Sequence, residues 1–261
     1  MSIEMLRKSN PLIHCMTNVV VTNFTANGLL AVGASPVMAY AKEEVADMAK
    51  VANALLLNIG TLSAESIDNM IIAGKAANKA GTPVVLDPVG AGATAFRTES
   101  CKRILKEVDV TIVRGNGGEI ATLSDQAGTV KGVDGSIDSD PVELAKHAAN
   151  VLNSAVVVTG EVDVVTDGTG TVRGYNGHPW LTKVVGTGCL SGAIVAAFAS
   201  LKTDDLLEVI GYGLVAYGVA AEKAYEETKA KGYGSFQTAF LNQLGRLTDE
   251  DVKQHGRFER S

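Results

Sequence analysis

The sequence predicts an α/β fold in which helices cover both faces of a mostly parallel central sheet. Short apolar runs such as 54–60 and 155–160 alternate with longer segments of helical periodicity, as expected of buried strands joined by crossover helices. Glycine is abundant, at 28 residues, and only 5% of the chain is aromatic, which suits helices packed closely on such a sheet. One α/β domain routinely fills a length of 261 residues, so a single domain over 1–261 is expected.

Charge and cysteine usage restrict the partners and the compartment. The formal net charge is −6 and no basic stripe is present, so we expect neither a nucleic-acid nor a membrane partner. The N-terminal residues lack the apolar core of a signal peptide, and no apolar run long enough to span a membrane follows. Cys15, Cys101 and Cys189 are widely spaced, which favours neither a disulfide framework nor a zinc site. These features predict a cytoplasmic protein that acts on a small molecule.

The first half of the chain alternates helices and strands. Helical spacing over 18–33 ends at Gly33, in the position of a C-cap. The following elements are expected in this order: a strand over 35–39, a helix over 43–53, a strand over 54–60, a helix over 61–81, a strand over 82–90, a helix around 98–107 and a strand over 108–113. Because crossover helices place successive strands in parallel, the carboxyl ends of these strands should meet at one edge of the sheet.

A loop and then a helix are expected after residue 123. Segment 124–139 is rich in glycine, serine and aspartate, which is typical of a loop. A helix should begin next, because Asp140 suits the N-cap, Pro141 suits the first helical position and Glu143 adds negative charge to the first turn. The periodicity predicts that this helix ends near residue 153.

The remaining segments predict an antiparallel edge and two further helices. Residues 162–166 and 171–175 alternate apolar and polar side chains around a glycine-containing turn, as in an antiparallel hairpin. Helices are expected over 206–229 and 235–247. The charged segment from about 246 to 261 is expected to be a polar, frayed tail of the domain.

Residues 184–192 carry the strongest indication of a binding site. Gly186 and Gly188 precede a helical pattern over 189–200, so a glycine loop should end where a helix begins. The first turn of a helix leaves backbone N–H groups without partners, and its dipole favours negative charge. We therefore predict a phosphate-binding loop, with a tight structural turn as the alternative.

Cys189 stands at or near the first position of that helix. A helix dipole can lower the pKa of a thiol there, and the loop would place the thiol beside a bound phosphate or hydroxyl. The alternative is a small buried hydrophobic residue, which is a common role for a free cysteine. The spacing alone leaves both interpretations open.

Polar residues also follow the strands at the edge where parallel sheets bind ligands. Asp87 ends one strand, and Arg114, Asn116 and Glu119 follow another. A guanidinium suits phosphate and a carboxylate suits Mg²⁺, whereas turn capping by Asp87 and a capping box of Asn116 with Glu119 are the structural alternatives. Thr159 ends a third strand and has either a nucleotide contact or a structural role. These residues alone predict a nucleotide-using enzyme.

Six ordered segments resemble the hydroxyethylthiazole kinase family. They are 12–18, 33–38, 86–89, 114–119, 158–161 and 184–189. Together they span nearly the whole chain, which makes them far more specific than one glycine loop. The resemblance implies a three-layer αβα ribokinase-like fold and transfer of the ATP γ-phosphoryl group to the hydroxyl of 4-methyl-5-(2-hydroxyethyl)thiazole, giving the thiazole phosphate for thiamine biosynthesis or salvage.

The resemblance also implies roles for the matched residues. ATP would contact Arg114, Thr159 and Asn116, and the thiazole would contact Met38, Gly186 and Asn18. Mg²⁺ and the phosphates would be served by Asp87 and Glu119, and the catalytic loop would comprise Gly186, Gly188 and Cys189. Family members are typically homotrimers with active sites between subunits, so Asn18 and Met38 should lie near a neighbouring chain.

Cys189 distinguishes the family from the wider ribokinase-like group, in which an aspartate usually closes this loop and acts as the base. A thiol forms weak hydrogen bonds, and a thiolate beside the γ-phosphate is electrostatically unfavourable. We therefore expect Cys189 to position the hydroxyl, because the loose transition state of phosphoryl transfer needs little early deprotonation.

Two other classes of protein remain as alternatives. One is another ribokinase-like enzyme, such as a hydroxymethylpyrimidine or pyridoxal kinase or a nucleotide-hydrate dehydratase, for which aspartate is expected at position 189. The other is a nucleotide sensor that binds ATP without turnover. The pair Asp87 and Glu119, together with Arg114, argues against a sensor, because binding alone seldom needs groups that handle a metal ion.

Overall fold

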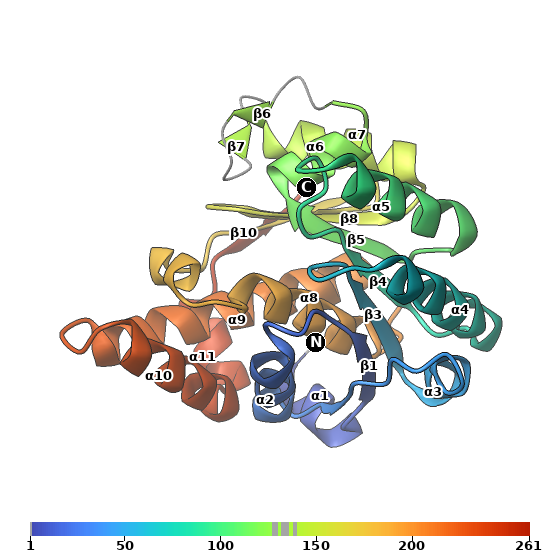
Figure 1. Ribbon diagram of the computed structural model, residues 1–261. Coiled ribbons are helices and arrows are strands. Elements are labelled where there is room, and N and C mark those ends of the chain that lie inside the picture. Colours follow the sequence, from blue (N-terminus) through green and yellow to red (C-terminus); the bar gives the residue numbers. More distant parts are fainter. Residues whose placement is uncertain (1, 127–129, 132–135, 138–139) are drawn as a thin grey trace.

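The computed structural model has one central sheet between two layers of helices (Figure 1), which confirms the predicted α/β class. It describes residues 2–126, 130–131, 136–137 and 140–261. Within these residues the strands of the main sheet are β1 (Leu12–Met16), β2 (Ser35–Val37), β3 (Ala54–Asn58), β4 (Val84–Asp87), β5 (Ile112–Asn116), β8 (Ala155–Thr159), β9 (Asp163–Thr166), β10 (Thr171–Gly174) and β11 (Phe258–Arg260). Their order across the sheet is β11-β10-β9-β8-β5-β4-β3-β1-β2.

Most of the sheet is parallel. Strands β2, β1, β3, β4, β5 and β8 pair in parallel. Strands β9, β10 and β11 continue the sheet in antiparallel pairings, so the predicted antiparallel hairpin at one edge is confirmed. The parallel strands all end at the same edge, which is where the polar residues of interest were expected.

The helices lie on both faces of the sheet (Figure 1). They are α1 (Ile3–Ser9), α2 (Thr22–Val32), α3 (Val45–Val51), α4 (Ala64–Ala80), α5 (Ala95–Glu107), α6 (Gly117–Leu123), α7 (Pro141–Leu152), α8 (Thr187–Ala199), α9 (Leu206–Thr228), α10 (Tyr233–Arg246), α11 (Asp249–His255) and the 3₁₀ helix η2 (Pro179–Lys183). Helices α3 to α7 share one apolar core with the sheet, and α1, α2 and α8 to α11 share the other. None of the described helices is long and apolar enough to cross a membrane.

Strand β3 explains why its sequence is a continuous apolar run. Leu55 and Leu57 belong to the core beneath α3 to α7, whereas Leu56 belongs to the core beneath α8. Successive side chains of a strand point to opposite faces, so a strand covered on both faces needs apolar residues throughout.

Two segments differ from the sequence-based expectation in ways that affect the site or the loop before α7. The strand expected over 108–113 is found at Ile112–Asn116, because α5 continues to Glu107 and Val108 is its C-cap. Arg114 and Asn116 therefore lie within β5 and do not follow it. The loop expected over 124–139 lies largely outside the described residues, within which β6 (Val130–Lys131) and β7 (Ser136–Ile137) pair antiparallel.

The expected frayed tail over 246–261 is wrong for the described structure. Helix α11 begins with a capping box between Thr248 and Asp251, and its Val252 is buried. Strand β11 pairs with β10 and forms the edge of the sheet. The polar residues of this segment cap a helix and form ion pairs such as that of Asp251 with Lys223, so its polarity does not imply disorder.

Replacement of Asp251 should destabilise this C-terminal segment. The hydrogen bond from Lys223 is the main cause that lowers the pKa of Asp251 to about 2, so its stabilisation is present above the pKa of an unfolded carboxyl and is lost as pH falls toward 2. We expect Asp251→Asn to lower the free energy of unfolding by about 1–2 kcal/mol at pH 7. Thermal unfolding would show a difference in Tm that shrinks below about pH 4.

Glu250→Gln is the matched control, because Glu250 lies in the same first turn and is exposed. A loss of stability in Asp251→Asn that does not change with pH, or an equal loss in Glu250→Gln, would contradict this account of α11.

Candidate active site

The carboxyl ends of the parallel strands bring the predicted residues together. Asn58 ends β3 and pairs in register with Asp87, which ends β4. Asn116 ends β5 and pairs in register with Thr159, which ends β8. Helix α8 meets this edge closely, since a Cβ added to Gly192 would lie 3.1 Å from Asp87 Oδ2.

A chain of hydrogen bonds links α8 to the buried carboxylate. Asn18 Nδ2 donates to Cys189 Sγ at 3.3 Å and to Asn58 Oδ1 at 2.9 Å. Asn58 Nδ2 in turn donates to Asp87 Oδ2 at 2.7 Å. Asn58 was not identified from the sequence, although it is the first polar residue after a run of leucines, immediately before Ile59 and Gly60. We call Cys189, Asn18, Asn58 and Asp87 the acceptor-side network.

The Arg114 guanidinium lies between Asp87 on β4 and Thr159 on β8. Its Nη1 lies 3.7 Å from Asp87 Oδ2, and its Nη2 donates to Thr159 Oγ1 at 2.8 Å. Thr159 Oγ1 also donates to the carbonyl oxygen of Gly115. Arg114 is mostly buried, so its charge acts in surroundings where water screens it weakly.

Asp87 has a strongly raised pKa. Its side chain is fully buried, and this burial raises its pKa to about 7, against the opposing effect of Arg114. Its second oxygen, Oδ1, has no hydrogen-bond partner among the described residues. A buried carboxylate oxygen without a donor is a position where a cation or a ligand proton would be stabilised.

Glu119 is held rigidly beside Asp87 by backbone groups. Its Oε2 accepts from Asn116 N–H at 2.9 Å, and Asn116 Oδ1 accepts from Glu119 N–H at 2.9 Å, which confirms the expected capping box. Its Oε1 accepts from Gly90 N–H at 2.8 Å. A side chain at Gly115 would crowd this carboxylate, because an added Cβ would lie 3.1 Å from Glu119 Oε2.

The two carboxylates fit Mg²⁺. Mg²⁺ takes oxygen ligands, keeps several waters and is usually held by one or two carboxylates together with substrate phosphates. Asp87 offers its unpartnered Oδ1, and each oxygen of Glu119 retains a lone pair beyond its one backbone hydrogen bond. The described residues contain no group of three or more His, Cys, Asp or Glu side chains suited to a metal, so phosphate and water would complete the coordination.

The glycine loop ends at α8, two residues earlier than the sequence indicated, because the helix begins at Thr187. Gly186 is its N-cap, with φ of 92°, and provides no side-chain cap. An added Cβ there would also approach Val21 and Phe24 at about 3 Å, so only glycine fits. The N–H groups of the first turn thus remain available for an anion.

Two hydroxyl groups hold this loop in place. Thr187 Oγ1 donates to the carbonyl oxygens of Leu181 and Val184. The buried Tyr217 donates its hydroxyl to the carbonyl oxygen of Thr187 at 2.7 Å. Gly188 is exposed, and an added Cβ would lie 3.8 Å from Arg114 Nη1. The first turn of α8 and the Arg114 guanidinium therefore adjoin, and both attract phosphate.

The pKa of the Cys189 thiol is raised and not lowered. Cys189 is the third residue of α8, and burial, followed by the charge of Asp87, raises the pKa of its thiol. Of the two interpretations that the spacing left open, the raised pKa agrees with the small, mostly buried residue and not with a thiol whose pKa is lowered. Cys189 is a neutral thiol at neutral pH.

Met38 follows β2 at the same edge and is half-buried. It packs against the core beneath α8, and the structure gives it no polar contact with the acceptor-side network.

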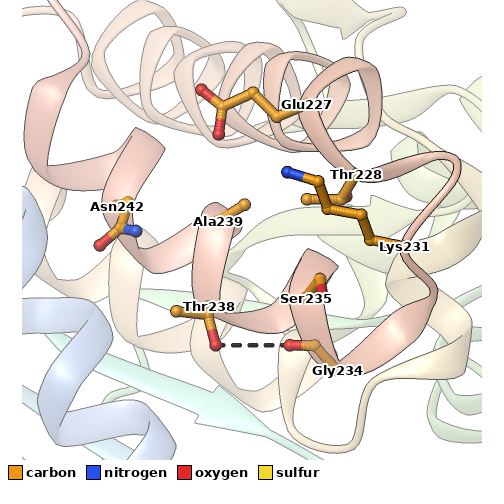
Figure 2. A pocket seen from close by; sticks show the side chains of 8 residues that line it. All are labelled: Glu227, Thr228, Lys231, Gly234, Ser235, Thr238, Ala239 and Asn242. Carbon is orange, nitrogen blue, oxygen red and sulfur yellow. Dashed lines mark hydrogen bonds between the residues drawn. The ribbon is translucent and has the colours of Figure 1, made fainter.

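A separate open pocket of about 400 Å³ lies between the end of α9 and α10 (Figure 2). Its lining residues are Glu227, Thr228, Lys231, Gly234, Ser235, Thr238, Ala239 and Asn242. None of them belongs to the strand edge, so this pocket is not part of the site.

The chain has the fold of ribokinase-like proteins. A solved ribokinase-like superfamily protein from Enterococcus faecalis V583 shares the fold with a TM-score of 0.68 over 94% of this chain and 95% of that chain, at 12% identity. The chain belongs to the hydroxyethylthiazole kinase family, whose model matches residues 3–250.

Individual relatives agree with this family. The hydroxyethylthiazole kinase of Halalkalibacterium halodurans is 98% identical over 261 residues, with 100% of both chains covered. The solved hydroxyethylthiazole kinase protein of Pyrococcus horikoshii OT3 is 41% identical and has a TM-score of 0.91, covering 99% of this chain and 97% of that chain. The family expected from the six sequence segments is thus confirmed.

The buried Asp87 should make the metal-free protein less stable as pH rises. Its folded pKa of about 7 lies above the ordinary value of 3.8, so the unfolded chain loses this proton first and stability falls between about pH 4 and 7. The loss is up to about 4 kcal/mol. Asparagine imitates the neutral carboxyl, so the Tm of Asp87→Asn relative to the parent should increase as pH rises from 5 to 8.

Thermal unfolding without nucleotide and with a chelator measures this difference. Asp109→Asn is the control, because Asp109 is exposed and remote from the strand edge. A Tm difference for Asp87→Asn that stays constant from pH 5 to 8 would disprove the effect of burial.

Proposed function

We propose that the chain transfers the γ-phosphoryl group of ATP to the hydroxyl of 4-methyl-5-(2-hydroxyethyl)thiazole and yields the thiazole phosphate used in thiamine biosynthesis. The observation that carries this proposal is the meeting of the first turn of α8 with Arg114 and Asp87, in a chain whose family and relatives bear the name of this kinase. Residues 1–261 act as one kinase domain in this proposal, and its cytoplasmic location is a prediction from the sequence.

The nucleotide lies along β5 and β8 in this proposal. Arg114 and Thr159 are joined by a hydrogen bond, and both contact the phosphates, with Asn116 beside them at the end of β5. The N–H groups of Gly188 and Cys189 face the transferring phosphoryl group. Charge develops on the oxygens of this group, and preorganised donors stabilise it without reorganisation.

Asp87 and Glu119 hold Mg²⁺, which supplies positive charge to the phosphate oxygens when bound. The protein's part is to fix the two carboxylates. Asp87 is held by Asn58 and Arg114, and Glu119 is held by the backbone of Asn116 and Gly90. Rigid carboxylates of this kind orient an ion and its phosphates at little entropic cost.

The thiazole contacts Met38, Gly186 and Asn18, and Cys189 positions its hydroxyl. A neutral thiol does not repel the γ-phosphate, which agrees with a positioning role. Val19, Val20 and Val185 are exposed apolar side chains beside these residues. Their exposure supports the expected homotrimer, in which a neighbouring chain covers them and completes the acceptor site.

Direct phosphorylation assays test the function. The protein with ATP and Mg²⁺ should phosphorylate the thiazole alcohol, and mass spectrometry should identify the thiazole phosphate, with the product absent when Mg²⁺ is removed. Hydroxymethylpyrimidine and pyridoxal serve as parallel acceptors. Phosphorylation of one of these alone would replace the substrate assignment, and ATP binding without any product would favour a sensor.

Variants of Cys189 test its role. A general base typically contributes about 10²–10⁴-fold to the rate, so Cys189→Ala should reduce kcat by well under about 10⁴-fold if the thiol only positions the hydroxyl. Cys189→Asp should retain or raise kcat, because it restores the more basic group of the wider fold class. An unchanged ATP affinity provides the control for an intact nucleotide site, and a folded but inactive Cys189→Asp would contradict the prediction.

A further inference from the structure

We propose that Asn58 is a positioning residue that orients the side-chain amide of Asn18, so that the Asn18 carbonyl oxygen Oδ1 accepts the hydrogen bond of the substrate hydroxyl. The inference rests on the proposed function only for the identity of the alcohol. The geometric basis of the inference is which atom donates and which accepts in each hydrogen bond of the acceptor-side network.

The orientation of the Asn58 amide is fixed from both sides. Asn58 is 1% exposed, and its Oδ1 accepts from the backbone N–H of Gly60 at 3.0 Å while its Nδ2 donates to Asp87 Oδ2 at 2.7 Å. A backbone N–H can only donate, so Asn58 must present its Oδ1 to Gly60 and its Nδ2 to Asp87. Rotation of this amide by 180° would leave the Gly60 N–H facing another donor, so only one orientation is stable.

This orientation determines that of Asn18. Because Asn58 presents Oδ1, Asn18 must present its Nδ2, which donates to Asn58 Oδ1 at 2.9 Å and to Cys189 Sγ at 3.3 Å. Both hydrogens of the Asn18 amide are then used. Asn18 Oδ1 receives no hydrogen bond from any described residue. It is not one of the solvent-inaccessible polar atoms that lack a partner, so it is an accessible acceptor beside α8.

The Asn18 side chain packs directly against the backbone of Gly60. A Cβ at Gly60 would lie 2.5 Å from Asn18 Nδ2 and 2.7 Å from Asn18 Cγ. The φ of Gly60 is not in the left-handed region, so glycine is required here for the close approach of Asn18. The same residue supplies the N–H that fixes Asn58, and it therefore supports both asparagines.

The reaction needs a hydrogen-bond acceptor for the hydrogen of the substrate hydroxyl, and Asn18 Oδ1 is suited to this role. An alcohol attacks phosphorus through a lone pair, so its O–H must point toward another acceptor. Cys189 Sγ is a weak acceptor and already receives a hydrogen from Asn18. The amide oxygen of Asn18 is the stronger acceptor, and a neutral acceptor suffices because the hydroxyl retains its proton until late in a loose transition state.

Binding of two ligands tests the proposal independently of turnover. Isothermal titration would compare the thiazole alcohol with 5-ethyl-4-methylthiazole, which has the same ring but no hydroxyl. The parent protein should bind the alcohol about 3–10-fold more tightly, as one net hydrogen bond provides. In Asn18→Leu and Asn58→Leu the ratio of the two Kd values should fall to about 1, because ring contacts are common to both ligands.

A second variant and a matched control separate orientation from stability. Gly60→Ala keeps both asparagines but displaces Asn18, and it should lower the same ratio. Asn176→Leu is the control, because Asn176 is also buried with its amide between a carboxylate, that of Glu222, and a backbone N–H, that of Arg257, outside the site. It should lower Tm and leave the ratio unchanged.

The outcomes are distinguishable. If folded Asn58→Leu or Gly60→Ala retains the full preference for the alcohol, the positioning role is wrong while the proposed function stands. If the parent binds neither ligand, the proposed function fails and this inference fails with it.

Discussion

The contact of the Asp87 carboxylate with Asn58 and Arg114 is the constraint on which the site depends. A buried charge is costly unless other groups compensate it, and these two partners come from the strands on either side of β4. Parallel pairing of β3, β4 and β5 therefore sets the geometry of the site as well as that of the sheet. Buried ion pairs contribute little net stability, so the apolar cores on the two faces of the sheet stabilise the fold that holds this carboxylate.

The sequence allowed many of the helices and strands and the antiparallel hairpin to be predicted, because periodicity and capping residues are local signals. Short elements such as α1 and β1 were not predicted. Asp87 and Thr159 could be singled out for the same reason, since each ends a strand, and Arg114 could be singled out because it lies near the end of β5. Asn58 was missed because its role depends on the register of β3 against β4 and on Asn18, which are non-local. The C-terminal edge strand was missed because β11 is held by backbone hydrogen bonds, and these leave little trace in side-chain composition.

Cys189 shows where a local rule fails. The position of a thiol in the first turn of a helix predicts a lowered pKa, but this rule assumes that solvent and a positive environment surround the sulfur. Here burial and the carboxylate of Asp87 raise the pKa. The spacing of residues in the sequence gives neither the burial of a side chain nor its neighbours from other strands. The direction of the pKa shift of Cys189 could therefore be determined only from the structure.

The two sides of the strand edge differ in charge, and this difference has a physical reason. Arg114, the first turn of α8 and the carboxylates of Asp87 and Glu119 form a charged side suited to phosphate and a divalent cation. The opposite side consists of two amides and a thiol, which are neutral. A carboxylate facing the alcohol would lie close to the polyanionic nucleotide and would need its own compensation in a poorly screened place. Since the loose transition state requires little basicity, a neutral and rigid acceptor can orient the alcohol without adding negative charge beside the γ-phosphate.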